Sequence, residues 1–201
     1  MNKKNQKGFT LLELIVVLAI IGILAAMLVP TIIRYTRKAA AKTDMANAKQ
    51  IYNAVKAVLV EDQEAYNSFY QHNTMKTNVV VRTKNDVESY RLVVACKCNA
   101  ADSVQYKVHD SVGWRGGNRE VETFCAALNE SNGYIEAEKS RSMKLTSHPG
   151  NKKTDLWLIC YRNDDPEHIE IWAGDSHGTG ESGPMYRVYP SPDKEYTNPS
   201  R

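Results

Sequence analysis

A 26-residue apolar stretch close to the amino terminus, positions 8–33, constrains this chain more than any other feature. Its only charged side chain is Glu13, and the 20 residues from Leu14 to Ile33 carry no charge. A helix of that length covers roughly 30 Å, the hydrocarbon thickness of a bilayer. A carboxylate in such a segment costs several kcal/mol and therefore marks a candidate functional site. The pattern predicts a single membrane-spanning helix whose acid has a specific role.

The residues that flank this stretch argue against a removable secretory signal. Such a signal has a shorter apolar core that ends in a small-residue cleavage site, whereas this run continues directly into Arg34, Tyr35 and Thr36. Basic residues stand on both sides, so the positive-inside rule leaves the orientation open. They are Lys3, Lys4 and Lys7 before the run, and Arg34, Arg37, Lys38 and Lys42 after it.

The segment Lys7-Gly8-Phe9-Thr10-Leu11-Leu12-Glu13-Leu14, followed by an apolar helix, resembles the class III signal of type IV pilins and pseudopilins. The resemblance implies that a membrane prepilin peptidase cuts after Gly8 on the cytoplasmic side and that the new amino terminus, Phe9, is methylated. Residues 1–8 are then a leader, and residues 9–33 are both membrane span and filament core.

Glu13 needs a partner if it is to stay ionised in an apolar layer. Cleavage would supply one, because the freed ammonium of Phe9 lies one helical turn away. In the family this acid pairs with the amino terminus of a neighbouring subunit, which makes Glu13 an assembly residue by resemblance. The spacing does not separate a pair within one chain from a pair between chains. Gly22 and Pro30 are candidate kink positions, since proline removes a backbone donor inside a helix.

The helix should continue past the membrane as an amphipathic segment, residues 34–62. No Pro or Gly interrupts positions 39–62, and apolar residues recur at helical spacing. They are Ala48, Ile51, Tyr52, Val55 and Leu59; Lys42, Asp44, Lys49 and Lys56 are expected to face outward. A helix from Phe9 to about Glu61 would be roughly 80 Å long.

Residues 63–201 are expected to form a globular α+β head, with an antiparallel sheet laid on the long helix. Positions 64–75 read as a loop or short helix, and positions 118–129 as a helix with Asn118 as its cap. Strands are predicted at 91–96, 156–161, 168–172 and 185–188, with a weaker alternation at 104–108.

Four cysteines, Cys96, Cys98, Cys125 and Cys160, would be able to oxidise in an exported domain. Cys96 and Cys98 are spaced at the limit for a mutual bridge. That leaves Cys96–Cys125 with Cys98–Cys160, or the crossed pairing, or four small buried thiols. The 41 residues after Cys160 hold no terminal cysteine pair of the Gram-negative kind. By resemblance this favours a Gram-positive, clostridial-type major pilin.

The remaining composition gives no case for catalysis or nucleic-acid binding. Without the three leader lysines, basic and acidic side chains are equal in number, so no bulk charge attracts nucleic acid. Positions 178–183 match G-x-G-x-x-G, but no βαβ unit surrounds them. We therefore expect no enzyme activity, cofactor or metal site.

The sequence predicts the major structural subunit of a type IV pilus, used for adhesion, surface motility, aggregation or biofilm formation. It would first sit in the cytoplasmic membrane with its amino terminus inside, then in a surface filament. The resemblance implies as partners other copies of the chain, the prepilin peptidase, the membrane assembly platform with its ATPase, minor pilins, and a host or abiotic surface. One alternative is a minor pilin, or a pseudopilin of a type II secretion or DNA-uptake apparatus. Another is a membrane-tethered binding module.

Overall fold

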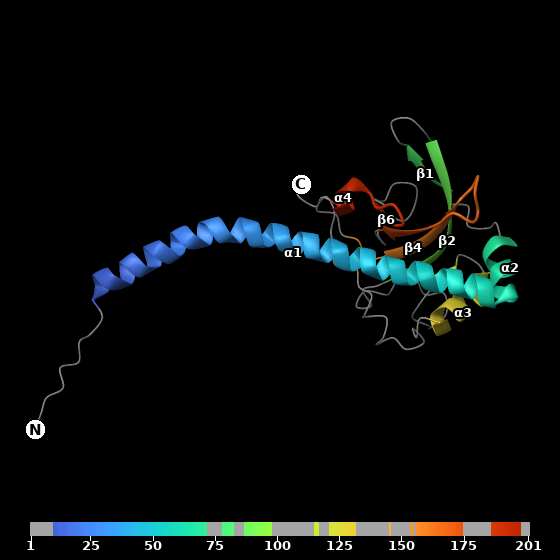
Figure 1. Ribbon diagram of the computed structural model, residues 1–201, viewed down its shortest axis with the longest axis horizontal. Helices are drawn as coiled ribbons and strands as arrows, with labels where there is room; N and C mark the ends of the chain where they lie inside the picture. Colours follow the sequence, from blue (N-terminus) through green and yellow to red (C-terminus); the bar gives the residue numbers. More distant parts are fainter. Residues whose placement is uncertain are drawn as a thin grey trace, which may run out of the picture.

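The computed structural model describes residues 10–71, 78–82, 87–97, 115–116, 121–131, 145, 154, 156–174 and 186–197. Its dominant element is α1, a helix of 51 residues from Leu11 to Glu61. The helix is about 75 Å long at 1.5 Å per residue. Figure 1 shows it as one continuous, gently curved rod, with the rest of the described structure gathered around its carboxyl-terminal half. The expected long helix that ends near Glu61 is therefore confirmed.

The two halves of α1 differ in burial. Ala48, Ile51 and Val55 of the predicted apolar stripe are fully buried, and Leu59 is nearly so, while Tyr52 is half-buried. The stripe extends further than predicted and includes Ala41, Asp44 and Val58. The expectation that Asp44 faces outward was wrong, because its side chain is fully buried. It falls three positions after Ala41 and four before Ala48, which is the buried face of the helix.

The sheet lies along this half of α1 and is antiparallel throughout. Its order is β1-β2-β4-β5-β6, and β3 pairs with β2 outside that path. The strands are β1 (Asn78–Arg82), β2 (Val87–Lys97), β3 (Arg115–Gly116), β4 (Leu156–Arg162), β5 (Ile169–Gly174) and β6 (Tyr186–Tyr189).

Alternation along the two central strands divides their side chains between two faces. Ile159 on β4 and Ile171 on β5 are register partners and belong to the same core cluster as α1. Their neighbours Cys160 and Glu170 are also register partners, on the opposite face. Both faces are buried, since all six residues of β5 are buried. A strand buried on both faces needs apolar residues at nearly every position, and Glu170 is the exception in β5.

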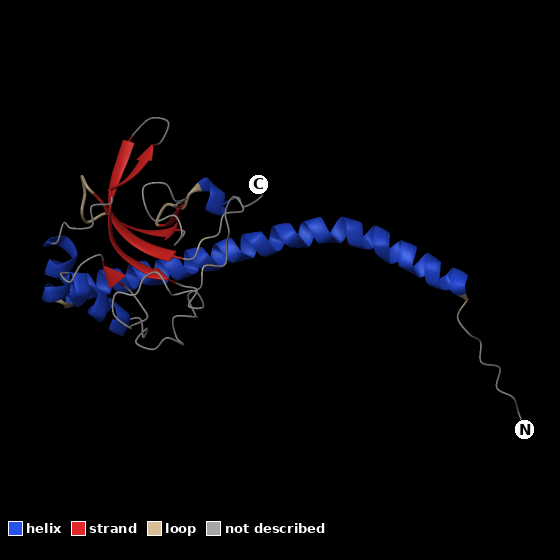
Figure 2. Cartoon of the chain, turned by 180° about the vertical axis from the view of Figure 1, so that it is seen from behind, coloured by secondary structure: helices blue, strands red, loops and turns tan. Residues whose placement is uncertain are grey.

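Three short helices complete the described head: α2 (Gln63–Gln71), α3 (Glu122–Ser131) and α4 (Lys194–Thr197). α2 turns back at the end of α1 and packs on α3 through the ring pair Phe69–Phe124, whose centroids are 4.7 Å apart. Figure 2 shows both helices at the end of the molecule that lies farthest from the amino terminus.

Most predicted elements of the head are present. The segment at 64–75, for which a loop or a short helix was expected, contains the helix α2, and the strands at 91–96, 156–161, 168–172 and 185–188 correspond to β2, β4, β5 and β6. The predicted helix at 118–129 appears as α3 but is displaced toward the carboxyl end. Its proposed cap Asn118 and the weak alternation at 104–108 lie outside the described residues. β1, β3 and α4 were not predicted, although three consecutive valines in β1 are a strand signal.

Candidate assembly site

The described structure begins at the amino-terminal cap of α1, where Thr10 and Glu13 bind each other. The Glu13 amide donates to Thr10 Oγ1 at 3.3 Å. In return Glu13 Oε2 accepts from the Thr10 amide at 2.9 Å and from the Thr10 hydroxyl at 2.8 Å. This reciprocal arrangement is a capping box, which satisfies backbone donors that a helix start otherwise leaves unpaired.

The capping box gives Glu13 a structural role that the sequence reasoning missed. The signal was present, since Thr-x-x-Glu ahead of an apolar run is the sequence pattern of a capping box. The cap points the carboxylate back toward the chain that precedes the helix, because both of its donors belong to Thr10. Gly8 and Phe9, the predicted cleavage and methylation positions, lie outside the described residues.

The apolar segment that follows makes no contact that hides it from solvent. All the large apolar side chains described as exposed between Leu11 and Ile33 retain between 45% and 76% of their accessible surface. α1 is the one helix among the described residues that is long and apolar enough to cross a membrane. Its most apolar 18-residue window has a mean hydropathy of 2.9. We call residues 11–33 the stem; it exposes far more contiguous apolar surface than a soluble monomer tolerates.

The two predicted kink positions lie within the stem, and the helix runs through both. Pro30 has no amide hydrogen, so the carbonyl of Ala26 lacks its usual helical donor. The hydroxyl of the next residue, Thr31, donates to the carbonyl of Met27 at 3.4 Å. Gly22 has open space where a side chain would start. The isolated chain therefore has a weakened but unbroken helix at Pro30, and a kink remains a prediction.

The cysteines are placed only in part. Cys160 is free and fully buried on the face of β4 that points away from α1. Both of the two-bridge pairings considered above used Cys160, so neither is present in this structure. The register explains why Cys96–Cys160 is out of reach: Cys96 lies opposite Trp157, while Cys160 lies opposite Leu92. Three residues of β4 separate the two levels by about 10 Å, beyond disulfide reach.

Cys125 is buried on α3, and Cys98 lies outside the described residues. Burial raises the pKa of the Cys160 thiol far above its usual range. An apolar setting of that kind makes a thiol inert, so Cys160 is a small core residue rather than a reactive one.

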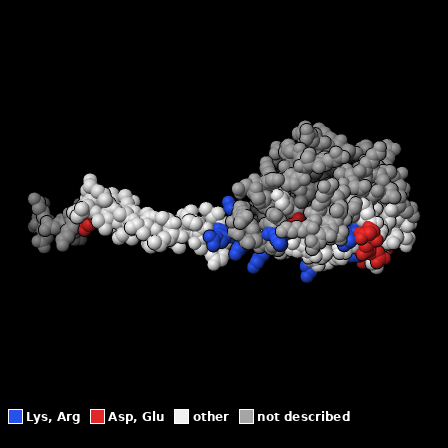
Figure 3. Space-filling model, turned by 90° about the horizontal axis from the view of Figure 1, so that it is seen from above, with Lys and Arg blue, Asp and Glu red and all other residues white. Residues whose placement is uncertain are grey.

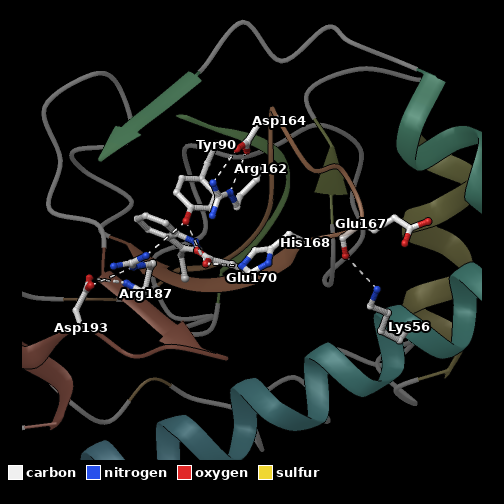
Figure 4. A network of polar contacts seen from close by, with 10 residues as sticks. Lys56, Tyr90, Arg162, Asp164, Glu167, His168, Glu170, Arg187 and Asp193 are labelled. Atoms are coloured by element: carbon white, nitrogen blue, oxygen red, sulfur yellow. Dashed lines mark hydrogen bonds and ion pairs between the residues drawn. The ribbon is translucent and has the colours of Figure 1, made fainter. Parts of the chain in front are cut away.

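A polar network crosses the face of the sheet that points away from α1, and Glu170 is its centre (Figure 4). Glu170 Oε1 lies 3.2 Å from the hydroxyl of Tyr90 and 3.1 Å from Nε2 of His168. Its Oε2 accepts from Nε1 of Trp172 at 3.0 Å. Arg187 on β6 donates to the Tyr90 hydroxyl at 3.4 Å and is ion-paired with Asp193 at 3.2 Å. The network thus joins β2, β5, β6 and the segment before α4.

Burial raises the pKa of Glu170, although its contacts with His168, Arg187 and Tyr90 oppose the shift. In the turn between β4 and β5, a bidentate hydrogen bond from Arg162 lowers the pKa of Asp164. On α2, desolvation raises the pKa of the Tyr70 hydroxyl to about 12.

Both oxygens of the Glu170 carboxylate have a hydrogen-bonding partner within the protein, so the network fits a structural role.

Within the described part of the chain, no group of three or more His, Cys, Asp or Glu side chains could hold a metal ion. Trp157 and Trp172 are core residues, with at most 2% of their surface exposed. The G-x-G-x-x-G match at 178–183 lies outside the described residues.

Comparison with known proteins concerns the stem and its flanks. The family model for the prokaryotic N-terminal methylation motif matches residues 3–29. The type IV major fimbrial protein FimA of Dichelobacter nodosus is 39% identical over 67 residues, which are 33% of this chain and 43% of that protein. The type IV major pilin protein PilA of Myxococcus xanthus is 40% identical over 68 residues, 34% of this chain and 30% of that protein. Over about a third of its length, this chain is similar to type IV major pilins.

Each of these matches covers about a third of this chain and less than half the length of the relative. The type IV wide pilus major component PilA4 of Thermus thermophilus is 53% identical, but over only 36 residues. No solved structure gives a significant match. The match to the family model therefore covers the capping box and most of the stem.

Proposed function

We propose that this chain is the major structural subunit of a type IV pilus. The observation that carries the proposal is the stem: an exposed apolar helix about 35 Å long, with a single carboxylate at its amino-terminal end. Such a surface is stable only in lipid or against other apolar surfaces. A subunit that is first inserted in a membrane and then packed among identical stems finds both environments in turn.

In this proposal the prepilin peptidase removes residues 1–8, and Phe9 becomes a methylated amino terminus. The membrane assembly platform and its ATPase then add the subunit to a filament. Glu13 pairs with the Phe9 amine of a neighbouring copy, which neutralises two charges in an apolar core. The head, with its sheet and short helices, covers the outside of the filament, where it serves adhesion, aggregation, motility or biofilm formation.

A minor pilin or pseudopilin would have the same kind of stem. The amount of this chain in sheared surface filaments distinguishes these alternatives from a major subunit, which would be the main protein there. A membrane-tethered binding module would also have an apolar anchor, but it would remain in the membrane fraction after shearing. The charge at the start of the stem favours a filament subunit over a simple anchor, since an anchor could complete the same capping box with an uncharged glutamine and avoid the cost of a carboxylate in its apolar segment.

Mass spectrometry of filaments sheared from cells tests the proposal. We expect this chain to be the most abundant protein in that fraction and to begin at Phe9 with a methylated amine. Recovery only in the membrane fraction, or filaments that retain the Met1 leader, would overturn it. Replacing Gly8 with a bulky charged residue should block cleavage and leave the unprocessed chain in the membrane, whereas Gly8→Ala should be cleaved in part.

A further inference from the structure

Basic side chains gather on α1 immediately after the stem. Arg34, Arg37, Lys38 and Lys42 are all exposed, and we call them the basic collar. Figure 3 shows basic side chains where the bare helix meets the head. Among the described residues, no ion pair within 4 Å joins the basic collar to an acid of its own chain. These four charges therefore face solvent at the base of the head.

Acidic side chains gather at the opposite end of the head, as Figure 3 also shows. Glu61 ends α1 and Glu64 lies in the first turn of α2, while Asp165 and Glu167 lie in the turn between β4 and β5. All four are exposed, and we call them the acidic tip. The turn is fixed to α1, because Lys56 Nζ donates to the carbonyl of Glu167 at 3.1 Å (Figure 4).

The two charged regions cannot neutralise each other within one chain. Lys38 and Glu61 lie on the same continuous helix and are separated by 23 residues, or about 35 Å. The Debye length at physiological ionic strength is about 8 Å, so their attraction across that distance is screened. A second copy, parallel to the first and shifted along the helix axis, can bring opposite charges together.

We propose that the basic collar of one copy docks on the acidic tip of another copy displaced by about 35 Å along α1. The inference rests on the proposed filament. All stems in a filament point the same way, so the base of an upper head faces the outer end of a lower one. The displacement is larger than the roughly 6 Å needed for the amine of Phe9 to reach a neighbour's Glu13. The two contacts therefore join a subunit to different neighbours, and together they fix its axial position.

Charge reversal in the full-length chain, in cells that make filaments, tests this interface. The tip variant combines Glu61→Lys with Glu64→Lys, and the collar variant combines Arg37→Glu with Lys38→Glu. Each turns several attractions into repulsions, so we expect sheared-filament yield to fall by about tenfold. The fourfold variant, with both reversals, should return to within about threefold of the wild-type yield. Lys49→Glu, on an exposed turn of α1 between the two regions, is the matched control and should change little.

Immunoblots of the membrane fraction show whether each variant is inserted. The neutral pair Arg37→Gln with Lys38→Gln replaces the collar variant if insertion suffers, and we expect it to lose about threefold in yield. Anionic lipid as the true partner of the collar would give a loss for the collar variant but none for the tip variant, which overturns the interface. Failure of the fourfold variant to recover overturns it as well. A wild-type chain that forms no filaments would instead overturn the proposed function.

Discussion

The stem and the head bury their apolar residues in opposite ways. In the head, the α1 stripe, β4, β5 and the short helices hide their side chains against one another, and the largest rings are almost inaccessible. In the stem, residues of the same types lie on the same helix and remain exposed. The described apolar residues of the head are covered by other parts of the same chain. The stem is as apolar as a protein core, but no other part of the described chain covers it. The contacts of the stem must therefore come from lipid or from other chains.

The same comparison holds for one glutamate in each region. Glu170 is 2% exposed and receives hydrogen bonds from Tyr90 and Trp172 of its own chain, with His168 also in reach. Glu13 is exposed, and among the described residues its carboxylate binds Thr10 alone. Glu170, a buried acid with partners in its own chain, helps to hold one particular packing of the head. Glu13 would enter an apolar layer with only its helix cap as a partner, and its carboxylate can still accept a hydrogen bond from a cation of another chain.

Replacing Glu13 should produce the largest effect on assembly. In Glu13→Val the neighbour's amine would be buried without a partner, which costs about 3–5 kcal/mol. We expect at least about a hundredfold loss of sheared filaments when the variant is the only subunit, with cleavage after Gly8 unaffected. Glu13→Gln is the matched control, since its amide oxygen still accepts from the Thr10 amide but carries no charge. Normal filament yield from Glu13→Gln would mean that the capping box, not the charge, is what assembly needs.

Shortening one isoleucine in each region to alanine should affect the stability of the folded protein very differently. Ile51 is fully buried in the head, whereas Ile21 retains 55% of its surface in the stem. Ile51→Ala should lower the free energy of unfolding by about 2–5 kcal/mol, because it leaves a cavity. Ile21→Ala should leave the thermal midpoint of detergent-solubilised monomer within about 2 °C of the wild type. Equal losses from both substitutions would show that the stem packs on its own head.

The pH dependence of the head should reveal Glu170, with a smaller effect. Burial raises its pKa in the folded head. Between the ordinary pKa of a glutamate and the raised one, the folded head holds a proton that the unfolded chain has released. Stability therefore falls as pH rises through that window, and the whole penalty is present above it.

Glu170→Gln removes this titration. The thermal midpoint of the variant should therefore rise relative to that of the wild type as pH is raised from about 4 to about 8. Glu167→Gln, at an exposed position, should follow the wild type across the range. If Glu170→Gln and the wild type keep a constant difference, the buried carboxyl does not titrate between those values.

The sequence predicted the long helix, its buried stripe and most strands, because apolar periodicity records local burial directly. It did not predict that Asp44 would be buried, since a single polar residue in an apolar stripe is normally assigned to solvent. The order of the strands was also out of reach, since pairing such as that of β2 with β4 joins segments far apart in the chain.

The sequence alone singles out Glu13 as a candidate assembly residue, whereas it gives no sign of the polar network in the head. Glu13 stands out because it interrupts a continuous apolar run, and Thr10 could have been added from its spacing to Glu13. Glu170 stands among ordinary strand residues, and its partners Tyr90 and Arg187 lie 80 residues before it and 17 after it. Only the register of β2, β5 and β6 brings them together.

The separation of stem and head can be measured directly by light scattering during size-exclusion chromatography of residues 35–201. Without the stem, the α1 stripe is still covered by the sheet and short helices, so this fragment should fold and elute as a monomer even at high concentration. Burial of stem against stem yields about 25 cal/mol per Å² of apolar surface, a driving force that the fragment lacks. Polymerisation of the fragment by itself would contradict this division and would make the head the assembly element.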